Sequence, residues 1–222
     1  MNLEPVDGDH ELTVRGQSLV LLPERAALWR ETETLLVADP HWGKAATFRA
    51  SGIPVPSGTT QDALDRVRSL TARTAARRIV FLGDLLHARA GRSEAMFQAL
   101  GEWRVADPTT EIVLVRGNHD RQAGDPPSSL RIECVNAPWP APPFVLAHHP
   151  VARPDGYVIA GHVHPGVRLY GAGGQRERLP CFVFGPDYAV LPAFGDFTGL
   201  ADVEPDPGHD VYAIADDRVI SI

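Results

Sequence analysis

Residues 78–87 read RIVFLGDLLH, an apolar run that ends in a glycine and a carboxylate. A run of this length, rich in Ile, Val, Leu and Phe, is typical of a strand that is buried on both faces of a sheet. Gly83 directly after the run permits a tight exit and a close approach of other groups to the backbone. The stretch therefore predicts a buried strand that places Asp84 at its carboxyl end.

The same arrangement of an apolar run and a polar cluster recurs along the chain. It occurs in TLLVAD (34–39), EIVLVRGNHD (111–120), FVLAHH (144–149) and YVIAGHVH (157–164). Between these runs, apolar side chains at helical spacing predict a helix over residues 59–78, with Thr59 or Thr60 as its cap, and a second helix over 92–103. Strands that alternate with helices favour an α/β sheet, in which ligands bind at the carboxyl ends of the strands.

The last third of the chain changes character. RLYG (168–171), CFVFGPDYAVLPAFG (181–195) and VYAIADDRVISI (211–222) consist of short strand-like runs separated by turn residues. Residues 11–29 resemble a hairpin-like pair of strands. We therefore expect a second sheet packed on the first. The expected fold is a layered α/β fold, a two-sheet β-sandwich flanked by helices, formed by a single domain over residues 1–222.

Composition limits the function classes. A chain of 222 residues suits one large domain, and no run of ~18 apolar residues predicts a membrane span. The net charge of −7 argues against a broadly basic nucleic-acid surface but not against a local one. Two cysteines, Cys134 and Cys181, form no disulfide framework. Because the segment MNLEPVDGDHEL is polar and acidic, unlike a secretory signal, we expect a cytoplasmic protein with two free thiols.

The polar clusters contain the side chains of a metal site. In an extended segment, residues two apart point to the same side, so that Asp39 with His41, and His162 with His164, can each share one ion. Carboxylate, imidazole and amide oxygen ligands suit Mn, Fe or Zn. Two such ions ~3.5–4 Å apart can clamp the attacking and leaving oxygens of a phosphoryl displacement. A bridging carboxylate is needed to hold them, and Asp84 is the best placed.

Each motif alone also has a plain structural interpretation. D-x-H pairs are most often surface or capping residues, G-D is a common turn, and G-N-H-D is compatible with a tight turn in which Asn is left-handed. The five clusters together, each at the end of an expected buried strand and in this order, rarely arise by chance. Their joint occurrence therefore predicts a metal centre.

At these residues the chain resembles the calcineurin-like metallophosphoesterase superfamily, whose motifs follow in the same order: D-x-H, G-D, G-N-H-[DE], H-x-P-like and G-H-x-H. The resemblance implies a two-sheet β-sandwich with flanking helices and two metal sites that share Asp84. The first site would consist of Asp39, His41, Asp84 and His164, and the second of Asp84, Asn118, His148 and His162. His119 would protonate the leaving oxygen without binding metal, and Asp120 would set its tautomer.

Two positions leave questions open. Many members of the superfamily carry G-D-x-x-D, whereas GDLLH ends in His87. This puts a second acidic contact in doubt and makes His87 a candidate substrate-facing group. The residues themselves do not separate His148 from His149 as the ligand, and only the likeness to H-x-P favours His148, with His149 as a structural residue.

A closer resemblance extends beyond the metal motifs. It rests on ADPHWGKAATFRASGIPVPSGTT (38–60), FLGDLLHARAGR (81–92), GNHDR (117–121), GHVHPG (161–166), RLPCF (178–182) and LPAFGDFTG (191–199). These stretches resemble the ligase-associated DNA damage response endonucleases, the PdeM-type phosphoesterases, although Pro40 stands where leucine is commoner. The resemblance implies a manganese-dependent phosphodiesterase that acts on nucleic acid and is encoded with a helicase and a DNA ligase in bacteria.

Residues near the motifs are candidates for substrate contact. Lys44 and Arg49 follow the first ligand pair, and phosphate contacts commonly use Lys or Arg, although a solvated surface is an equal alternative. Residues 48–58, with two prolines, suit a semi-rigid loop at the mouth of the site. Weaker candidates are Arg89, Arg92 and Arg121, and the stacking or core residues Trp42 and Trp139.

These observations predict a phosphodiesterase with two divalent ions, most simply Mn with Fe or Zn as alternatives, that hydrolyses DNA or a related phosphodiester. One alternative is a phosphatase or a small-molecule phosphodiesterase, for example of cyclic nucleotides, with the same centre. A long basic groove would favour DNA and a closed pocket a small substrate. A non-enzymatic scaffold is a further alternative, which the intact ligand set opposes.

Overall fold

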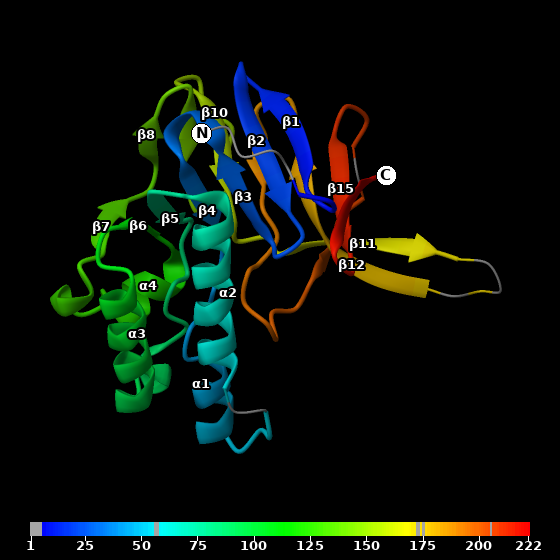
Figure 1. Ribbon diagram of the computed structural model, residues 1–222. Coiled ribbons are helices and arrows are strands. Elements are labelled where there is room, and N and C mark those ends of the chain that lie inside the picture. The colour runs from blue at the N-terminus through cyan, green and yellow to red at the C-terminus, as the bar shows by residue number, and fades with distance from the viewer. Residues whose placement is uncertain (1–5, 56–57, 172–173, 175, 205) are drawn as a thin grey trace.

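Two β-sheets packed face to face form the part of the chain that the computed structural model describes, residues 6–55, 58–171, 174, 176–204 and 206–222. Figure 1 shows the two sheets with helices on the outer side of the first. The first sheet has the order β1 (His10–Val14), β2 (Gln17–Leu22), β3 (Ala26–Trp29), β4 (Thr34–Val37), β5 (Arg78–Phe81), β6 (Glu111–Arg116) and β7 (Glu133–Asn136). Strands β4 to β7 pair in parallel, and β1 to β4 pair antiparallel.

The second sheet is mixed. Its strands are β8 (Trp139–Ala141), β9 (Phe144–Leu146), β10 (Tyr157–Ala160), β11 (Pro165–Tyr170), β12 (Arg176–Phe184), β13 (Tyr188–Val190), β14 (Ala201–Asp202), β15 (Asp210–Ala215) and β16 (Arg218–Ser221). They follow the order β14-β11-β12-β13-β10-β9-β8, with β15 and then β16 attached to β12. An isolated bridge between Ala38 and Ala193 links the segments after β4 and β13. The sheets are therefore joined at the carboxyl ends of their strands.

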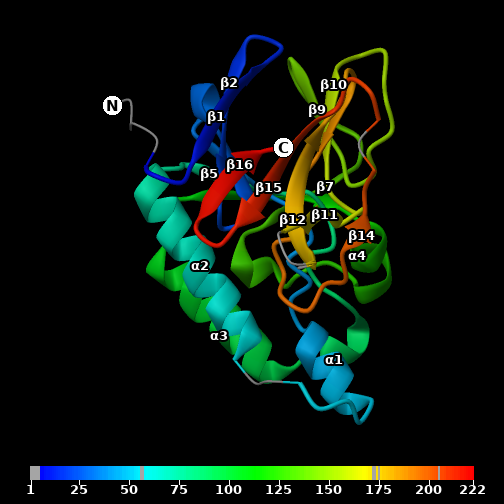
Figure 2. The same cartoon turned by 90° about the vertical axis from the view of Figure 1, so that its right-hand side faces the viewer.

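Two helices, α2 (Thr59–Thr74) and α3 (Glu94–Ala106), cover the outer face of the first sheet. The other helical segments are α1 (Lys44–Ala50), which packs on the 3-10 turn η2 (Arg89–Gly91), α4 (Asn118–Ala123), and the 3-10 turns η1 (Arg30–Thr32) and η3 (Ser128–Leu130). Figure 2 shows α2 and α3 side by side against that sheet. The fold expected from the sequence, a two-sheet sandwich flanked by helices, is thus confirmed.

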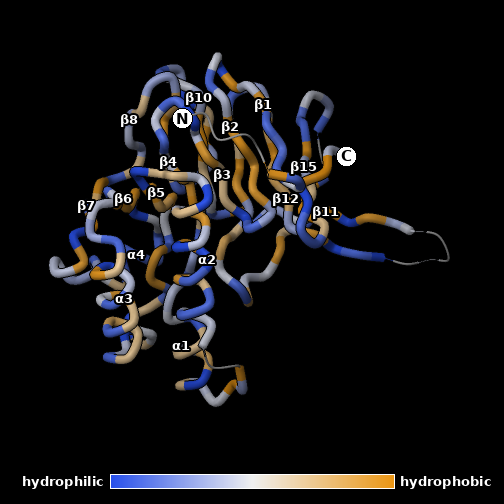
Figure 3. The backbone as a smooth tube through the Cα atoms, viewed as in Figure 1, coloured by the Kyte–Doolittle hydropathy of each residue, from blue (hydrophilic) through white to orange (hydrophobic). Residues whose placement is uncertain are grey.

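The central strands are apolar on both faces because each face meets a different layer. In β5, Ile79 and Phe81 face the helices, whereas Val80 faces the second sheet. In β6, Leu114 faces the helices and Val113 the second sheet. Since side chains alternate along a strand, burial on both sides demands a continuous apolar run. Figure 3 shows this hydrophobic interior between the more hydrophilic helices and edges.

Several element boundaries differ from the sequence predictions. Helix α2 ends at Thr74 rather than at residue 78, because Ala75 adopts a left-handed φ of 50°. Gly58, with a φ of 92°, is its N-cap residue, and neither Thr59 nor Thr60 caps it. The second helix is shifted to Glu94–Ala106 because the side chain of Ser93 accepts a hydrogen bond from the amide of Met96.

Three further predictions are corrected or limited. Residues 11–29 contribute to three strands, β1 to β3, rather than to one pair. The expected loop over residues 48–58 begins as helix, since α1 extends to Ala50, and positions 56 and 57 lie outside the described residues. Trp42 is buried against Phe81 and Trp103, so it is a core residue rather than a stacking platform.

In the described part of the chain, none of the helices is long and apolar enough to cross a membrane.

Candidate metal centre

The expected ligands converge where the strands end. Asp39 follows β4, Asp84 follows β5, Asn118 begins α4 just after β6, His148 follows β9, and His162 follows β10. Because β4, β5 and β6 are parallel, their carboxyl ends meet at one edge of the first sheet. Strands β9 and β10 of the second sheet are also parallel and bring their histidines to the same edge. Residues far apart in sequence therefore form one cluster.

Asp84 lies between two groups of side chains. Its Oδ2 atom is 3.8 Å from Nε2 of His41. Its Oδ1 atom is 3.4 Å from Nε2 of His148 and accepts a hydrogen bond of 2.9 Å from the amide of His119. The two carboxylate oxygens thus face different histidines. This is the geometry in which one carboxylate can serve two neighbouring ions.

The first group contains Asp39, His41 and His164. Nε2 of His41 is 3.4 Å from Nε2 of His164, and the latter is 3.8 Å from Oδ2 of Asp39. The possible ligand atoms of these three residues all lie within 4.8 Å of one another. Asp39 and His41 are buried, so the D-x-H motif is an interior feature rather than a surface or capping pair.

The second group centres on His148. Its Nε2 atom is 2.9 Å from Oδ1 of Asn118 and 3.1 Å from Nδ1 of His162. Its Nδ1 atom is 3.0 Å from the carbonyl oxygen of Leu82, which requires a proton on Nδ1 and leaves the lone pair on Nε2. His149 is exposed, with its ring centroid 4.0 Å from that of His162. The direct contacts of His148 with Asp84 and Asn118 support it as the ligand, while His149 also lies within reach, since its ligand atom is within 4.8 Å of those of His148 and His162.

The cluster fits divalent cations. Oδ1 of Asp39 is buried and has no hydrogen-bond partner among the described residues. A buried carboxylate oxygen without a partner is costly unless a cation compensates it. The imidazole nitrogens of His41 and His164, and of His148 and His162, approach one another at hydrogen-bond distances, as ligands of a common ion do. The donors are oxygens and imidazole nitrogens, which suit Mn, Fe or Zn.

Two histidines of the cluster, His41 and His148, are neutral in this environment. Burial, followed by the charge of Lys44, lowers the pKa of His41 to about 2. Burial also lowers the pKa of His148 to about 4. The 3.8 Å approach of His41 to Asp84 therefore joins a neutral imidazole to a carboxylate and is not a salt bridge. Neutral imidazole is the form that binds metals, so burial prepares these rings as ligands.

The backbone at the ligands is unusual. Asp39, His41, Asp84, His162 and His164 all have positive φ angles, between 48° and 69°. This left-handed region is uncommon for residues other than glycine, although Asp and His are enriched there. Such conformations persist only where the surrounding structure enforces them, and they concentrate at functional sites. Five of the expected ligands therefore share this conformation, which also occurs outside the site, for example at Glu33 and Phe197.

Two glycines give the ligands their space. Gly83 has a φ of 87°, and a Cβ atom there would run into the ring of His148. A Cβ atom on Gly117 would meet the carboxylate and amide of Asp84. The close backbone approach expected after the β5 strand is thus present. Both positions need glycine so that Asp84 and His148 can meet.

His119 lies at the rim of the cluster, with Nε2 3.9 Å from Oδ2 of Asp84. The expected role of Asp120 in setting its tautomer differs from the structure. Nδ1 of His119 is 2.6 Å from the carbonyl oxygen of His87, and Asp120 accepts hydrogen bonds from the amides of Leu86 and Gly117. Asp120 therefore holds two loops together, and a backbone carbonyl fixes the His119 tautomer. Burial raises the pKa of Asp120 to about 6.

The remaining expected substrate contacts lie in different surroundings. His87 stacks on His119 with centroids 4.9 Å apart, and its Nδ1 is 3.3 Å from Nδ1 of His41. Burial lowers the pKa of His87 to about 4. Lys44 is half-buried at the start of α1, where burial lowers its pKa against the opposing effect of Asp39 and Asp84. Arg49 is exposed in the last turn of α1.

Fold and centre together define a metal-dependent phosphoesterase. Residues 33–190 match the calcineurin-like phosphoesterases, and the chain belongs to this family. It is similar to a solved structure described as the Pseudomonas putida nuclease MPE, with 41% sequence identity and a TM-score of 0.86 over 96% of this chain and 100% of that chain.

A more distant likeness is to Yfce, a phosphoesterase from E. coli, with 16% identity and a TM-score of 0.41 over 85% of this chain and 97% of that one. None of the curated proteins compared with the chain matches it.

Proposed function

We propose that the protein is a dinuclear phosphodiesterase that hydrolyses phosphodiester bonds in DNA. The observation that carries the proposal is the position of Asp84, whose Oδ2 faces His41 and whose Oδ1 faces His148. A carboxylate shared between two ligand groups is what a two-ion site requires, and two-ion sites are characteristic of enzymes that displace phosphoryl groups.

Seven side chains would hold the two ions. One ion would be held by Asp39, His41, Asp84 and His164, and the other by Asp84, Asn118, His148 and His162. When bound, divalent ions of this kind supply Lewis-acid activation of water and neutralise charge on phosphoryl oxygens. The donor set combines oxygen with imidazole ligands and contains no thiolate, which suits manganese, iron or zinc. We propose manganese as the working metal because the resemblance to the ligase-associated endonucleases implies it, with iron and zinc as alternatives.

His119 is proposed as the general acid. Its Nδ1–H donates to the carbonyl of His87, so a second proton on Nε2 is the one available to a leaving oxygen at the rim. His87 stacks on this ring, and Lys44 is near enough for its charge to act on His87; both are proposed to face the substrate. Arg49 on α1 is proposed to contact phosphate at a greater distance from the centre. Asp120 is proposed to act by holding the loop that carries His119.

The choice of DNA as substrate is supported by the likeness to a nuclease over nearly the whole chain. From the resemblance of the sequence motifs to the ligase-associated endonucleases, we further propose a cytoplasmic role in bacterial DNA repair, in functional association with a helicase and a DNA ligase. The competing proposal is a phosphatase or small-molecule phosphodiesterase with the same centre.

A metal-screened assay separates the proposals. The apoprotein would be reconstituted with Mn²⁺, Fe²⁺ or Zn²⁺ and given single-stranded DNA, duplex DNA, bis(p-nitrophenyl) phosphate and p-nitrophenyl phosphate. Cleavage of DNA and of the diester, with the highest turnover in Mn²⁺, is the expected result. Preference for the monoester would establish the phosphatase instead, and hydrolysis of the small diester without cleavage of DNA would establish the small-molecule enzyme.

A further inference from the structure

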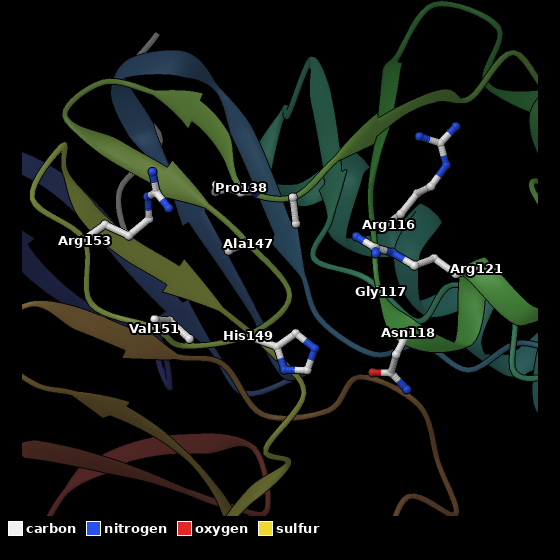
Figure 4. A pocket seen from close by; sticks show the side chains of 10 residues that line it. Arg116, Gly117, Asn118, Arg121, Pro138, Ala147, His149, Val151 and Arg153 are labelled. Atoms are coloured by element: carbon white, nitrogen blue, oxygen red, sulfur yellow. The ribbon is translucent and has the colours of Figure 1, made fainter.

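A cavity of about 270 Å³ opens beside the second ligand group. It lies between β6 and α4 on one side and the segments around β8 and β9 on the other, with Asn118 and His149 at its inner end (Figure 4). Asn118 is a proposed metal ligand, so anything bound in the cavity is adjacent to the reacting phosphate. The cavity is smaller than most sites for drug-sized ligands. Its size therefore suits one nucleoside rather than a length of duplex.

The three guanidinium groups at the cavity differ in their partners. Arg116 forms two hydrogen bonds with Asp125, of 2.8 and 2.7 Å. Arg153 forms two with Asp155, of 2.8 and 2.9 Å. Arg121 is exposed on α4, and among the residues that the structure describes its guanidinium forms no hydrogen bond or ion pair, although its backbone amide donates to the carbonyl of Gly117. Arg121 is thus the one of the three whose charge is left for a ligand.

The opposite part of the cavity is apolar. Ala137, Pro138, Ala147 and Val151 line it, and Val151 is 66% exposed. Figure 4 shows Pro138, Ala147 and Val151 across the cavity from Arg121 and Asn118. An apolar wall with an exposed valine, facing a guanidinium without an acidic partner across the cavity, suits a ligand that has both an apolar face and a negative charge. A nucleotide has both, since a base presents a flat apolar face and its phosphate is anionic.

We propose that this cavity binds the nucleoside adjacent to the scissile phosphodiester. The base lies against Pro138 and Val151, and Arg121 binds the next phosphate along the strand. This inference rests on the proposed phosphodiesterase function and adds a substrate subsite to it.

The test compares a substrate that reaches the cavity with one that does not. Steady-state kinetics would be measured in Mn²⁺ for a short single-stranded oligonucleotide and for bis(p-nitrophenyl) phosphate, which has no second phosphate. Because a hydrogen bond to a charged group commonly changes affinity about tenfold, Arg121→Ala is expected to raise KM for the oligonucleotide by about that factor. Its kcat/KM for bis(p-nitrophenyl) phosphate is expected to stay within about twofold.

A second variant and a control complete the test. Val151→Asp, at an exposed position, places a negative charge on the apolar wall and is expected to raise KM for the oligonucleotide to a similar extent. Arg77→Ala serves as the control, since Arg77 is exposed beside Glu33 at the opposite end of β5. Unchanged oligonucleotide KM in both cavity variants would overturn the subsite. Equal losses on both substrates would place Arg121 at the centre and also overturn it. A wild-type protein that cleaves neither substrate would instead refute the proposed function.

Discussion

The imidazole of His119 is held by the backbone of His87, whose carbonyl oxygen lies 2.6 Å from Nδ1. The His87 ring stacks on the same imidazole at an interplanar angle of 20°. One residue thus fixes both the tautomer and the plane of the other. Because the tautomer is set by a carbonyl, it does not depend on the charge of a neighbouring carboxylate. The orientation of Nε2 towards the centre is a property of the loop after β5.

His119→Ala tests this arrangement. We expect the variant to retain its metals, since His119 is not among the proposed ligands, and to lose turnover by about 10²- to 10⁴-fold, as is usual for a general acid. Metal content by elemental analysis and kcat on a phosphodiester would be measured together. Turnover close to wild type would refute the catalytic role, and loss of one ion would make His119 a ligand.

Asp84→Asn tests the bridging ligand. The substitution keeps the size of the side chain but removes the negative charge that both ligand groups share. We expect metal content to fall at both sites and activity to disappear. Asn118→Ala is the matched comparison, because Asn118 contacts the second group only and its loss should spare the first ion. A fully metallated and active Asp84→Asn protein would contradict the bridging assignment.

Removal of metal is expected to destabilise the fold. The buried Asp39 oxygen without a partner and the crowded imidazoles are compensated when cations bind. Ligand at about 100 times its Kd stabilises a protein by about 2.7 kcal/mol, which for a chain of this length corresponds to a Tm shift of about 5–10 °C. The shift would be measured by calorimetry after chelation and after addition of Mn²⁺. Asp84→Asn should show little of it, and an equal shift in that variant would point to binding elsewhere.

The strands and the order of the ligands were predictable because both are local properties of the sequence. Burial of β5 and β6 on two faces requires continuous apolar runs, and such runs are visible without a structure. The ligands follow these runs directly, so their convergence follows from parallel pairing. Helix ends were less predictable, since the ends of α2 depend on the φ angles of Gly58 and Ala75 rather than on side-chain caps.

The contacts that set the chemistry were not predictable from residue types. The tautomers of His119 and His148 depend on the carbonyls of His87 and Leu82, and every residue has a carbonyl. The prediction for Asp120 was wrong for the same reason. Because Asp120 is next to His119 in the sequence, we expected its carboxylate to bind that histidine, but it accepts hydrogen bonds from the backbone amides of Leu86 and Gly117. Residue types likewise do not distinguish Arg121 from Arg116 and Arg153, because only the structure shows that the latter two pair with Asp125 and Asp155.

Arg73 is expected to matter for stability rather than for activity. In the last turn of α2 it binds the carboxylate of Asp9 through two hydrogen bonds of 3.0 Å and also binds Glu24. Since the Asp9 side chain is only 5% exposed, Arg73→Ala leaves a largely buried charge without its partner. We expect a loss of about 2–3 kcal/mol in the free energy of unfolding.

The matched control for Arg73 is Arg68→Ala on the same helix. Arg68 forms an exposed pair with Asp65, and such pairs contribute about 0–1 kcal/mol. Urea unfolding of both variants, with metal present, would compare them, and kcat should be unchanged in each. Restoration of part of the lost stability by adding Asp9→Asn to Arg73→Ala would identify the uncompensated carboxylate as the cause. Equal stability of the two single variants would contradict the buried ion pair.

Cys181 predicts a loss of stability at alkaline pH. It is fully buried in β12, and burial raises the pKa of its thiol from 9.0 to about 12. A group whose pKa is raised by folding stabilises the protein below its unfolded pKa, and this contribution is lost as the pH rises towards the folded value. The affected window is therefore between about pH 9 and about pH 12. At about pH 10.5 the thiol accounts for a loss of about 2 kcal/mol.

Cys181→Ala removes this titration. We expect the variant to be somewhat less stable than wild type near pH 8, because a buried side chain is truncated. The difference should shrink or reverse by about pH 10.5, since only the wild type has the thiol to deprotonate on unfolding. Urea unfolding at both pH values would measure the difference in free energy of unfolding between wild type and Cys181→Ala, with Cys134→Ala as the comparison. Burial raises the pKa of the partly exposed Cys134 only to about 11, so the pH range over which the Cys134 thiol lowers stability ends at a lower pH than that of Cys181. Parallel pH profiles for wild type and Cys181→Ala would show that the Cys181 thiol does not titrate differently in the folded protein.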